Sequence, residues 1–248
     1  TLIRHLDTPS QETLAQNAGY INQLVANVSV PVYFGLIPSA AEVWADRLPA
    51  GAPTADEQAI IDEMYRAVQA HTVDLCTTLN AHRDEDLYYR TDHHWTSLGA
   101  YYGYTALMEA MGLEAAPLDQ AGKTTVSDSF YGTLFSRSGV RWIAPDQIDR
   151  YISEAGVEVT SYPEGSPVEG SLYVDSFLQE KDQYSSFLGG NQPLCVIRTE
   201  HTDAPRVLVI RDSYTDSLAP FLTQNFSEIH LFDPRMNLTS VKGYVEEN

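Results

Sequence analysis

The chain has 248 residues, with 15 Lys and Arg against 34 Asp and Glu, which gives a formal net charge of −19. This balance argues against a protein whose main partner is a nucleic acid or an anionic membrane, because both need a surplus of Lys and Arg. With 43% hydrophobic and 20% charged residues, the composition is typical of a packed globular protein. The longest apolar stretch, residues 30–38, is too short to cross a bilayer, so we expect no transmembrane helix in this chain.

The first half of the chain alternates predicted helices with predicted strands. Apolar residues at three- and four-residue spacing predict helices over residues 10–28, 55–70 and 97–111. Apolar and β-branched runs predict strands over residues 30–37, 73–76 and 87–90. The third helix is expected to end at Gly112, since glycine is common just after a helix.

The second half begins with an irregular region and then returns to alternation. Short alternating segments at residues 157–162 and 171–177 predict hairpins or ordered loops inserted at about 115–192. Strands are then predicted over residues 194–198, 206–211 and 228–232, with a helix over 215–225 and a helix start at 239. Alternating elements of this kind imply parallel strands covered by helices. We therefore expect one three-layer α/β/α domain over residues 1–248, with a parallel sheet and a β-rich insertion.

The two cysteines, Cys76 and Cys195, each lie in an apolar run. Neither has the spacing of a zinc or redox motif. We favour two buried free thiols over a disulfide between them.

The densest group of chemically active side chains lies at residues 91–96, between a predicted strand and a predicted helix. In an extended segment Asp92 and His94 share one side, whereas His93 points to the other. Three interpretations stay open: a polar segment that caps the following helix, an Asp–His pair in which the carboxylate orients a general base, and a metal site. The other histidines are scattered without ligand spacing, which disfavours the metal.

A second feature is the apolar strand at residues 207–210, which ends just before Ser213 and a predicted helix. A serine there would lie at the carboxyl edge of a parallel sheet, where ligands usually bind. Backbone N–H groups at Ser213 and Tyr214 could then stabilise an oxyanion. Ordinary helix capping is the competing interpretation.

Together these features resemble a known family. The Asp-His-His-Trp run at 92–95 is similar to the signature of the DHHW protein family, and the similarity extends to its surroundings at residues 88–101. Further blocks that resemble the family lie at residues 130–139, 187–191 and 211–214.

The resemblance extends to the SGNH/GDSL hydrolase superfamily, and especially to the alginate O-acetylation proteins, which carry an Asp-x-His-Trp motif ahead of the serine. It implies a catalytic triad of Ser213 as nucleophile, His94 as base and Asp92 as orienter. The motif order would then be permuted relative to common SGNH enzymes, which place the serine first. Common SGNH enzymes also draw oxyanion donors from a Gly-x-Asn-Asp block that this sequence lacks. Asn191, Asn237 and the turn at 189–190 are the candidates that remain.

Several neighbouring residues are candidates for oxyanion or substrate binding, each with a structural alternative. Arg235, after the strand at 228–232, could stabilise negative charge or simply lie on a surface turn. Arg90 and His93 flank the Asp–His pair and could equally be packed or solvated. Trp95 could stack on a sugar, although a tryptophan that begins a helix more often belongs to the core.

The leading hypothesis is therefore an SGNH-like serine esterase or O-acetyltransferase that acts on a cell-envelope or extracellular polysaccharide, or on a small acyl ester, without metal or organic cofactor. The alternative is a non-catalytic carbohydrate-binding or assembly domain that keeps the fold. A metal-dependent hydrolase that uses residues 92–94 comes third. By resemblance we expect an exported bacterial protein, extracellular or at the cell surface, with a membrane anchor in a segment outside this chain.

Overall fold

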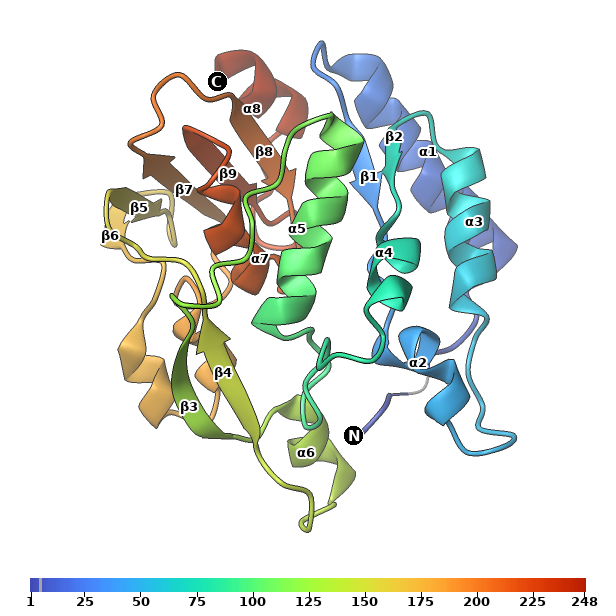
Figure 1. The fold of residues 1–248 in the computed structure, drawn as a ribbon. Helices are drawn as coiled ribbons and strands as arrows, with labels where there is room; N and C mark the ends of the chain where they lie inside the picture. Colours follow the sequence, from blue (N-terminus) through green and yellow to red (C-terminus); the bar gives the residue numbers. More distant parts are fainter. Residues whose placement is uncertain (5) are drawn as a thin grey trace. The chain divides into compact units, whose positions relative to one another are not determined.

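The computed structural model describes residues 1–4 and 6–248, and these residues form two compact units (Figure 1). Unit 1 comprises residues 1–2, 86–104 and 115–238, and unit 2 comprises residues 3–85, 105–114 and 239–248. Each unit is described by itself below. The expectation of one domain over residues 1–248 stays a prediction.

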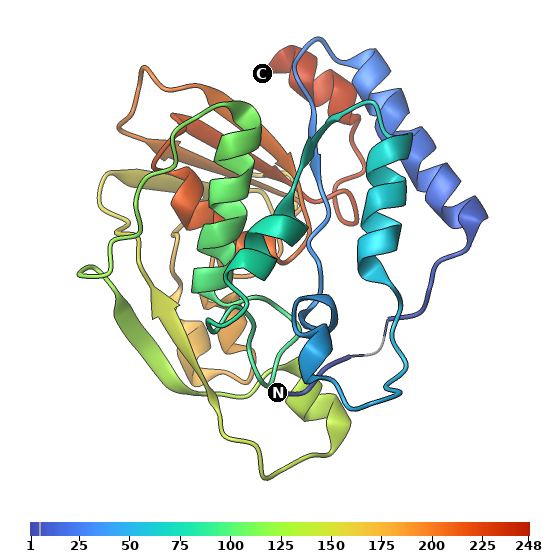
Figure 2. The same ribbon diagram turned by 45° about the vertical axis from the view of Figure 1, so that its right-hand side comes forward.

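Unit 1 is built on a five-stranded sheet with the order β6-β5-β7-β9-β8. Its strands are β5 (Val157–Ser161), β6 (Val168–Gly170), β7 (Leu194–Thr199), β8 (Arg206–Ile210) and β9 (Glu228–Phe232). Helix α7 (Thr215–Leu222) connects β8 to β9 and lies on one face of the sheet (Figures 1 and 2). Strands β8 and β9 are parallel, with Arg206 opposite Glu228 and Ile210 opposite Phe232.

The expected parallel sheet is wrong for most of these pairings. Strands β5 and β6, β5 and β7, and β7 and β9 all pair antiparallel. The reason is the length of the connections, because a parallel crossover needs about a dozen residues or more. Only residues 200–205 separate β7 from β8, so the chain turns back on itself, whereas α7 gives β8 and β9 the long connection that parallel pairing needs.

The rest of unit 1 surrounds the predicted site. Strands β3 (Thr124–Phe130) and β4 (Asp146–Arg150) form an antiparallel ribbon, and helix α6 (Thr133–Ser138) follows β3. Helix α5 (Ser97–Met111) begins in this unit, and two 3₁₀ turns span Asp175–Gln179 and Gln183–Ser186. The predicted strand at 87–90 is reduced to a single bridge between Tyr88 and Trp95, and the segment at 171–177, predicted as a hairpin or ordered loop, is a loop with one bridge between Tyr173 and Phe187. A buried cluster fills the space between these elements: Tyr89, Phe130, Ile148, Tyr184 and Phe187.

Unit 2 contains helices α1 (Gln11–Asn27), α2 (Ala40–Val43), α3 (Glu57–Ala67), α4 (Leu75–Ala81) and α8 (Val241–Glu247), a 3₁₀ turn at Ala45–Arg47, and strands β1 (Tyr33–Gly35) and β2 (His71–Val73). The two strands pair in parallel, as their helical connection predicts. The apolar stripes of α1 and α3 meet in one buried cluster, formed by Leu14, Ala18, Met64 and Val68.

Two predicted elements of unit 2 differ in the structure. The strand expected at 73–76 ends at Val73, because Asp74 Oδ1 accepts a hydrogen bond from Thr77 N and so starts α4. The last helix is capped by Ser240 rather than Thr239. In both cases a capping side chain determines the residue at which the helix begins.

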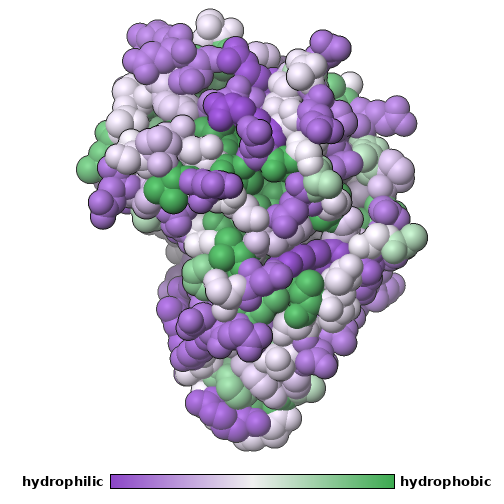
Figure 3. All heavy atoms as spheres, turned by 90° about the vertical axis from the view of Figure 1, so that its left-hand side faces the viewer, coloured by the Kyte–Doolittle hydropathy of each residue, from purple (hydrophilic) through white to green (hydrophobic). Residues whose placement is uncertain are grey.

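The remaining general expectations concern thiols and membrane spans. Cys76 and Cys195 are buried and free, as predicted. Within residues 1–4 and 6–248, every helix is too short or too polar to cross a bilayer. On the side drawn in Figure 3, hydrophobic residues form small groups between hydrophilic ones.

Candidate active site

Ser213 lies between strand β8 and helix α7. After β8 ends at Ile210, Arg211 N still donates to Phe232 O of the neighbouring strand at 2.9 Å. Asp212 Oδ1 then accepts from Tyr214 N at 3.0 Å, a local turn that aspartate side chains favour. Ser213 is thereby held immediately before the first turn of α7, with its side chain partly exposed.

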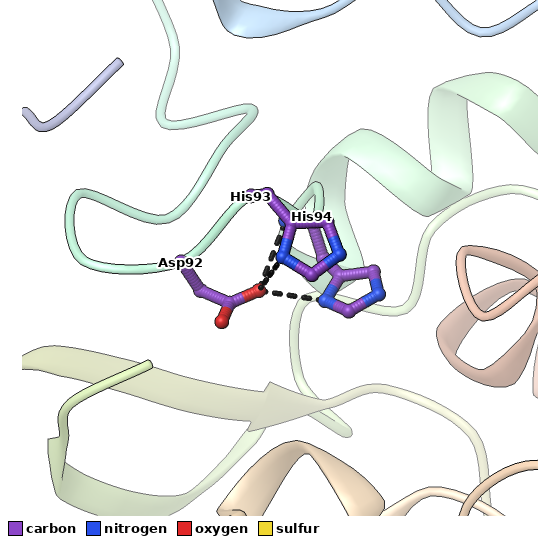
Figure 4. Close-up of side chains that lie close together, drawn as sticks. All are labelled: Asp92, His93 and His94. Carbon is purple, nitrogen blue, oxygen red and sulfur yellow. Dashed lines mark hydrogen bonds and ion pairs between the residues drawn. The ribbon is translucent and has the colours of Figure 1, made fainter. Parts of the chain in front are cut away.

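Asp92 and His94 lie on the short loop that precedes α5. Their side chains point toward each other, and the His93 ring lies beside that of His94 (Figure 4). Asp92 Oδ1 is 2.6 Å from His94 Nδ1 and also accepts from His94 N at 3.0 Å. His94 Nε2 in turn is 2.7 Å from Ser213 Oγ. The three predicted catalytic residues therefore form one continuous hydrogen-bonded chain, although 119 positions separate His94 from Ser213.

The second oxygen of Asp92 is held by the start of α6. Asp92 Oδ2 accepts from Thr133 N at 2.6 Å and from Thr133 Oγ1 at 3.0 Å. The preceding residue is Gly132, where an added Cβ would overlap the Asp92 carboxyl group. Burial opposes ionisation of Asp92, but the hydrogen bond and charge of His94 and the N–H of Thr133 outweigh it, so the pKa of Asp92 is lowered. Asp92 is therefore an ionised carboxylate that fixes the His94 ring.

An aromatic residue that we did not single out completes the environment of His94. The Tyr184 ring stacks on the His94 imidazole, with centroids 3.9 Å apart and an angle of 7° between the planes. Its hydroxyl donates to Ser213 O at 3.0 Å and lies 3.1 Å from Ser217 Oγ. Burial raises the pKa of Tyr184 well above its ordinary value, so the hydroxyl stays protonated.

The loop that carries Asp92 is anchored by a buried carboxylate, Asp146 at the start of β4. Asp146 Oδ1 accepts from Arg90 N at 2.8 Å, and Oδ2 accepts from Thr91 N at 2.8 Å and Thr91 Oγ1 at 2.5 Å. Thr91 Oγ1 also accepts from Gly132 N at 3.1 Å. Asp146 thus fixes the segment at 90–91, and the Thr91 hydroxyl joins this segment to Gly132.

The predicted residues Asn191 and Arg235 contact each other directly, and Arg211 contacts Asn191 as well. Asn191 Oδ1 accepts from Arg211 Nη1 at 3.1 Å and from Arg235 Nη2 at 3.2 Å. Because the Asn191 oxygen faces two guanidinium groups, its Nδ2 is left as a donor directed elsewhere. Arg211 is buried beside Asp216, and Arg235 is paired with Asp233 at 2.6 Å, which lowers the pKa of Asp233.

Backbone donors at Ser213 differ in their availability. The Tyr214 N–H is occupied by Asp212, so it is not the free donor that we expected. The Ser213 N–H has no acceptor among the described residues. Among the described residues the Ser213 N–H and Asn191 Nδ2 thus have no acceptor, and neither do the buried Nε and Nη2 of Arg211.

The three other candidates have different surroundings. Trp95 is only 1% exposed, and its Nε1 donates to Tyr214 O at 2.9 Å and Ser217 Oγ at 3.0 Å, so it supports the start of α7 and cannot stack on a sugar. Arg90 Nη2 is 2.5 Å from Pro145 O and its Nε is 3.3 Å from Asp146, so its guanidinium is held at the start of β4. His93 is partly exposed, and its Nδ1 lies 2.8 Å from Thr133 Oγ1 and 3.4 Å from Asp92 Oδ1. The expectation that His93 points away from Asp92 and His94 is wrong, because the chain bends at 91–94 and brings the His93 ring to 3.9 Å from that of His94.

Asp92, His93 and His94 also form the group whose atoms could hold a metal ion, because one ligand atom from each lies within 4.8 Å of the others. In this structure both ring nitrogens of His94 are engaged, Nδ1 by Asp92 and Nε2 by Ser213. A metal at His94 would have to displace one of these contacts. The donor set therefore fits the hydrogen-bonded chain better than a cation.

Sequence reasoning missed Tyr184, Gly132, Thr133 and Asp146. Gly132 and Thr133 lie in the block at 130–139 that resembles the DHHW family, so the sequence pointed to the segment without indicating a role. Tyr184 and Asp146 lie in the irregular region, where nothing local distinguishes them from packed or solvated residues.

Comparison with known proteins places this geometry in a family. No curated protein matches the chain. A DHHW family protein from Eubacterium siraeum has 27% identity and a TM-score of 0.85, over 95% of this chain and 80% of that one. Bacillus cereus PatB1 with a sulfonyl adduct has 21% identity and a TM-score of 0.78, over 97% and 86%. The O-acetyltransferase domain of Pseudomonas putida AlgJ has 18% identity and a TM-score of 0.51, over 91% and 72%.

The similarity to PatB1 and to the AlgJ domain is one of fold. This chain shares a mixed α/β fold with that O-acetyltransferase domain. The sequence pattern of the DHHW protein family matches residues 11–232. The chain belongs to the DHHW protein family.

Proposed function

We propose that this protein is a serine-dependent acyl-transfer enzyme, an O-acetyltransferase or acetyl esterase acting on a cell-envelope or extracellular polysaccharide. Ser213 is the nucleophile, His94 the general base and Asp92 the residue that orients the base. The observation that carries the proposal is the unbroken sequence of contacts from Asp92 through His94 to Ser213.

The direction of these hydrogen bonds suits the chemistry. An ionised Asp92 only accepts, so His94 Nδ1 carries the proton of that bond and Nε2 is left as an acceptor for the Ser213 hydroxyl. Ser213 Oγ then attacks the acetyl carbonyl carbon while His94 Nε2 takes its proton. The carbonyl oxygen becomes an oxyanion, and we propose the Ser213 N–H and Asn191 Nδ2 as the donors that stabilise it.

The second half of the reaction reverses these roles. The tetrahedral intermediate collapses, His94 returns its proton to the departing alcohol, and an acetyl ester remains on Ser213 Oγ. A sugar hydroxyl or water then gives its proton to His94 and attacks this ester. Collapse of the second tetrahedral intermediate breaks the bond between Ser213 Oγ and the acyl carbon, and His94 returns the proton to Ser213 Oγ. Transfer and hydrolysis differ only in the acceptor. The steps need no metal or organic cofactor.

Supporting evidence for the reaction class comes from the fold. The chain shares its fold with the AlgJ O-acetyltransferase domain, and acetyl transfer to an extracellular polymer would occur outside the cell or at its surface. The competing interpretation, a non-catalytic carbohydrate-binding domain, was motivated by the missing Gly-x-Asn-Asp block. The Ser213 N–H and Asn191 Nδ2 are candidate donors that could serve without that block, and this weakens the motive for a non-catalytic domain.

The test is turnover of p-nitrophenyl acetate, with and without an oligosaccharide acceptor. We expect an acetyl-enzyme burst, and acceptor that gains acetyl groups would identify a transferase. Ser213→Ala should remove both the burst and the turnover. A folded wild-type protein that shows neither burst nor turnover would favour the non-catalytic alternative, and loss of turnover with a chelator would favour a metal hydrolase.

A further inference from the structure

Helix α6 and the loop that follows it form a surface that the proposed chemistry does not use. Residues 129–145 contain no Asp or Glu, in a chain that has 34 of them, but they contain Arg137 and Arg141. Both arginines are exposed. We call α6 together with the loop at 139–145 the α6 platform. It is locally cationic on a protein whose net charge is −19.

The α6 platform also presents an unusual aromatic side chain. Trp142 is 86% exposed, whereas tryptophan is on average among the highly buried residues. The loop that carries it extends past the ends of β3 and β4 (Figures 1 and 2). The indole is therefore open to a flat ligand face.

The loop is held in place by contacts within the platform. Arg141 Nη1 donates to Phe135 O and to Val140 O, each at 3.0 Å. The Arg141 guanidinium lies 4.7 Å from the centroid of the Phe135 ring. The centroid of the Tyr131 ring, from the segment just before α6, lies 4.2 Å from that of the Phe135 ring. A surface fixed in this way needs little ordering when it binds.

The same segment holds the catalytic carboxylate. Thr133, the first residue of α6, contacts Asp92 through both its N–H and its hydroxyl, and Phe135 N donates to Thr91 O at 2.9 Å. A six-residue helix is about 9 Å long, so the platform begins at the catalytic loop and leads away from it. A polymer can contact both places at once, whereas a small ester cannot.

We propose that the α6 platform binds an anionic polysaccharide, the polymer whose hydroxyl or acetyl ester reacts at Ser213. Trp142 stacks on a sugar face, and Arg137 and Arg141 pair with carboxylate or phosphate groups of the polymer. The role of this polymer as the reacting substrate rests on the proposed function. Binding itself does not, because none of these side chains belongs to the catalytic chain.

An anionic membrane is the competing partner, since Trp and Arg also mark surfaces that lie on lipids. Such surfaces usually carry a cluster of about four to eight basic residues. The α6 platform has two, and the rest of the chain is strongly acidic. The two arginines and the exposed Trp142 indole therefore favour a soluble anionic polysaccharide, whose sugar rings can stack on the indole.

The test is affinity electrophoresis in the Ser213→Ala background, with polygalacturonate as the anionic polymer and pullulan as the neutral one. Trp142→Ala and Arg137→Gln should each weaken polygalacturonate binding by about threefold to tenfold, and added salt should weaken it further. The matched controls, Tyr20→Ala for an exposed aromatic and Arg206→Gln for an exposed arginine, should leave it unchanged. Thermal unfolding confirms that each variant is folded.

Three outcomes would overturn the inference. They are equal retardation by pullulan and polygalacturonate, no change in Trp142→Ala and Arg137→Gln, and binding to anionic phospholipid vesicles without binding to either polymer. Failure of the proposed function would look different, because wild-type protein would show no acetyl-enzyme while polymer binding remained measurable.

Discussion

The Tyr184 ring lies flat against the His94 imidazole, and the Tyr184 hydroxyl donates to the backbone oxygen of Ser213 at 3.0 Å. One side chain therefore holds both the proposed base and the proposed nucleophile. Because burial keeps this phenol protonated, the hydrogen bond to Ser213 persists across the physiological pH range.

Removing the hydroxyl tests that role. Tyr184→Phe keeps the stacked ring but leaves Ser213 O without this donor, so we expect a loss of about 1 kcal/mol in the free energy of unfolding. Tyr184→Ala removes the ring as well and should cost about 3 to 5 kcal/mol. If kcat for p-nitrophenyl acetate falls in Tyr184→Ala no further than in Tyr184→Phe, the ring does not position His94.

Asp92→Asn should disable the base without disrupting the fold. The asparagine amide carries no negative charge to hold the proton on His94 Nδ1, so the imidazole is no longer fixed in one tautomer. We therefore expect kcat to fall by about 10⁴-fold. Turnover measured from pH 6 to 9 checks the result. A loss of less than tenfold would show that Asp92 does not orient the base.

Gly132→Ala tests the fit between α6 and the catalytic carboxylate. An added Cβ would overlap the Asp92 side chain, so we expect a loss of about 1 to 3 kcal/mol in unfolding free energy together with reduced turnover. Gly19→Ala is the matched control, because nothing lies within 4 Å of the added Cβ in helix α1. That substitution should stabilise the helix by about 0.5 to 1 kcal/mol. Equal behaviour of the two variants would contradict the close packing at Asp92.

Asn191→Asp separates the two functions of the Asn191 side chain. The carboxylate still accepts from Arg211 and Arg235, but it lacks the Nδ2 donor. We expect kcat to fall by about 10²- to 10³-fold, the range for loss of one oxyanion donor, with the thermal midpoint retained. Unchanged kcat would remove Asn191 from the oxyanion site.

The raised pKa of Asp216 predicts that the free energy of unfolding depends on pH. Burial raises its pKa to about 6, against the opposing effect of Arg211. The folded protein therefore binds this proton more tightly than the unfolded chain, whose carboxyl titrates near pH 4. From this group alone, the free energy of unfolding falls as the pH rises from about 4 to about 6.

Asp216→Asn removes that titration. Between pH 4 and pH 7, the difference in unfolding free energy between variant and wild type should move in favour of the variant by up to about 3 kcal/mol. Urea unfolding at four pH values measures it. A difference that is constant with pH would contradict a raised pKa.

The fold was predictable where one local pattern decides an element. The stripes of α1 and α3, the β8-α7-β9 unit and the ends of α5 all follow from spacing and from residues such as Gly112. The direction of β7 was not predicted correctly, although the short connection at 200–205 was visible in the sequence.

The site was predictable where its residues lie in short motifs. Asp92 and His94 lie in one short motif, and the resemblance to the DHHW family joined them to Ser213, although the segment is bent rather than extended and His93 lies on the same side as they do. Tyr184 and Asp146 could not be found in this way, because their contacts join segments more than 25 positions apart. Such pairings depend on tertiary packing, which a single sequence does not reveal.

The most direct measurement is labelling with a fluorophosphonate probe, followed by mass spectrometry of wild type, Ser213→Ala and His94→Ala, each with and without a chelator. The account predicts one adduct on Ser213 in the wild type, none in Ser213→Ala, strongly slowed labelling in His94→Ala, and no effect of the chelator. Folded wild-type protein that stays unlabelled, or an adduct that persists in Ser213→Ala, would contradict it.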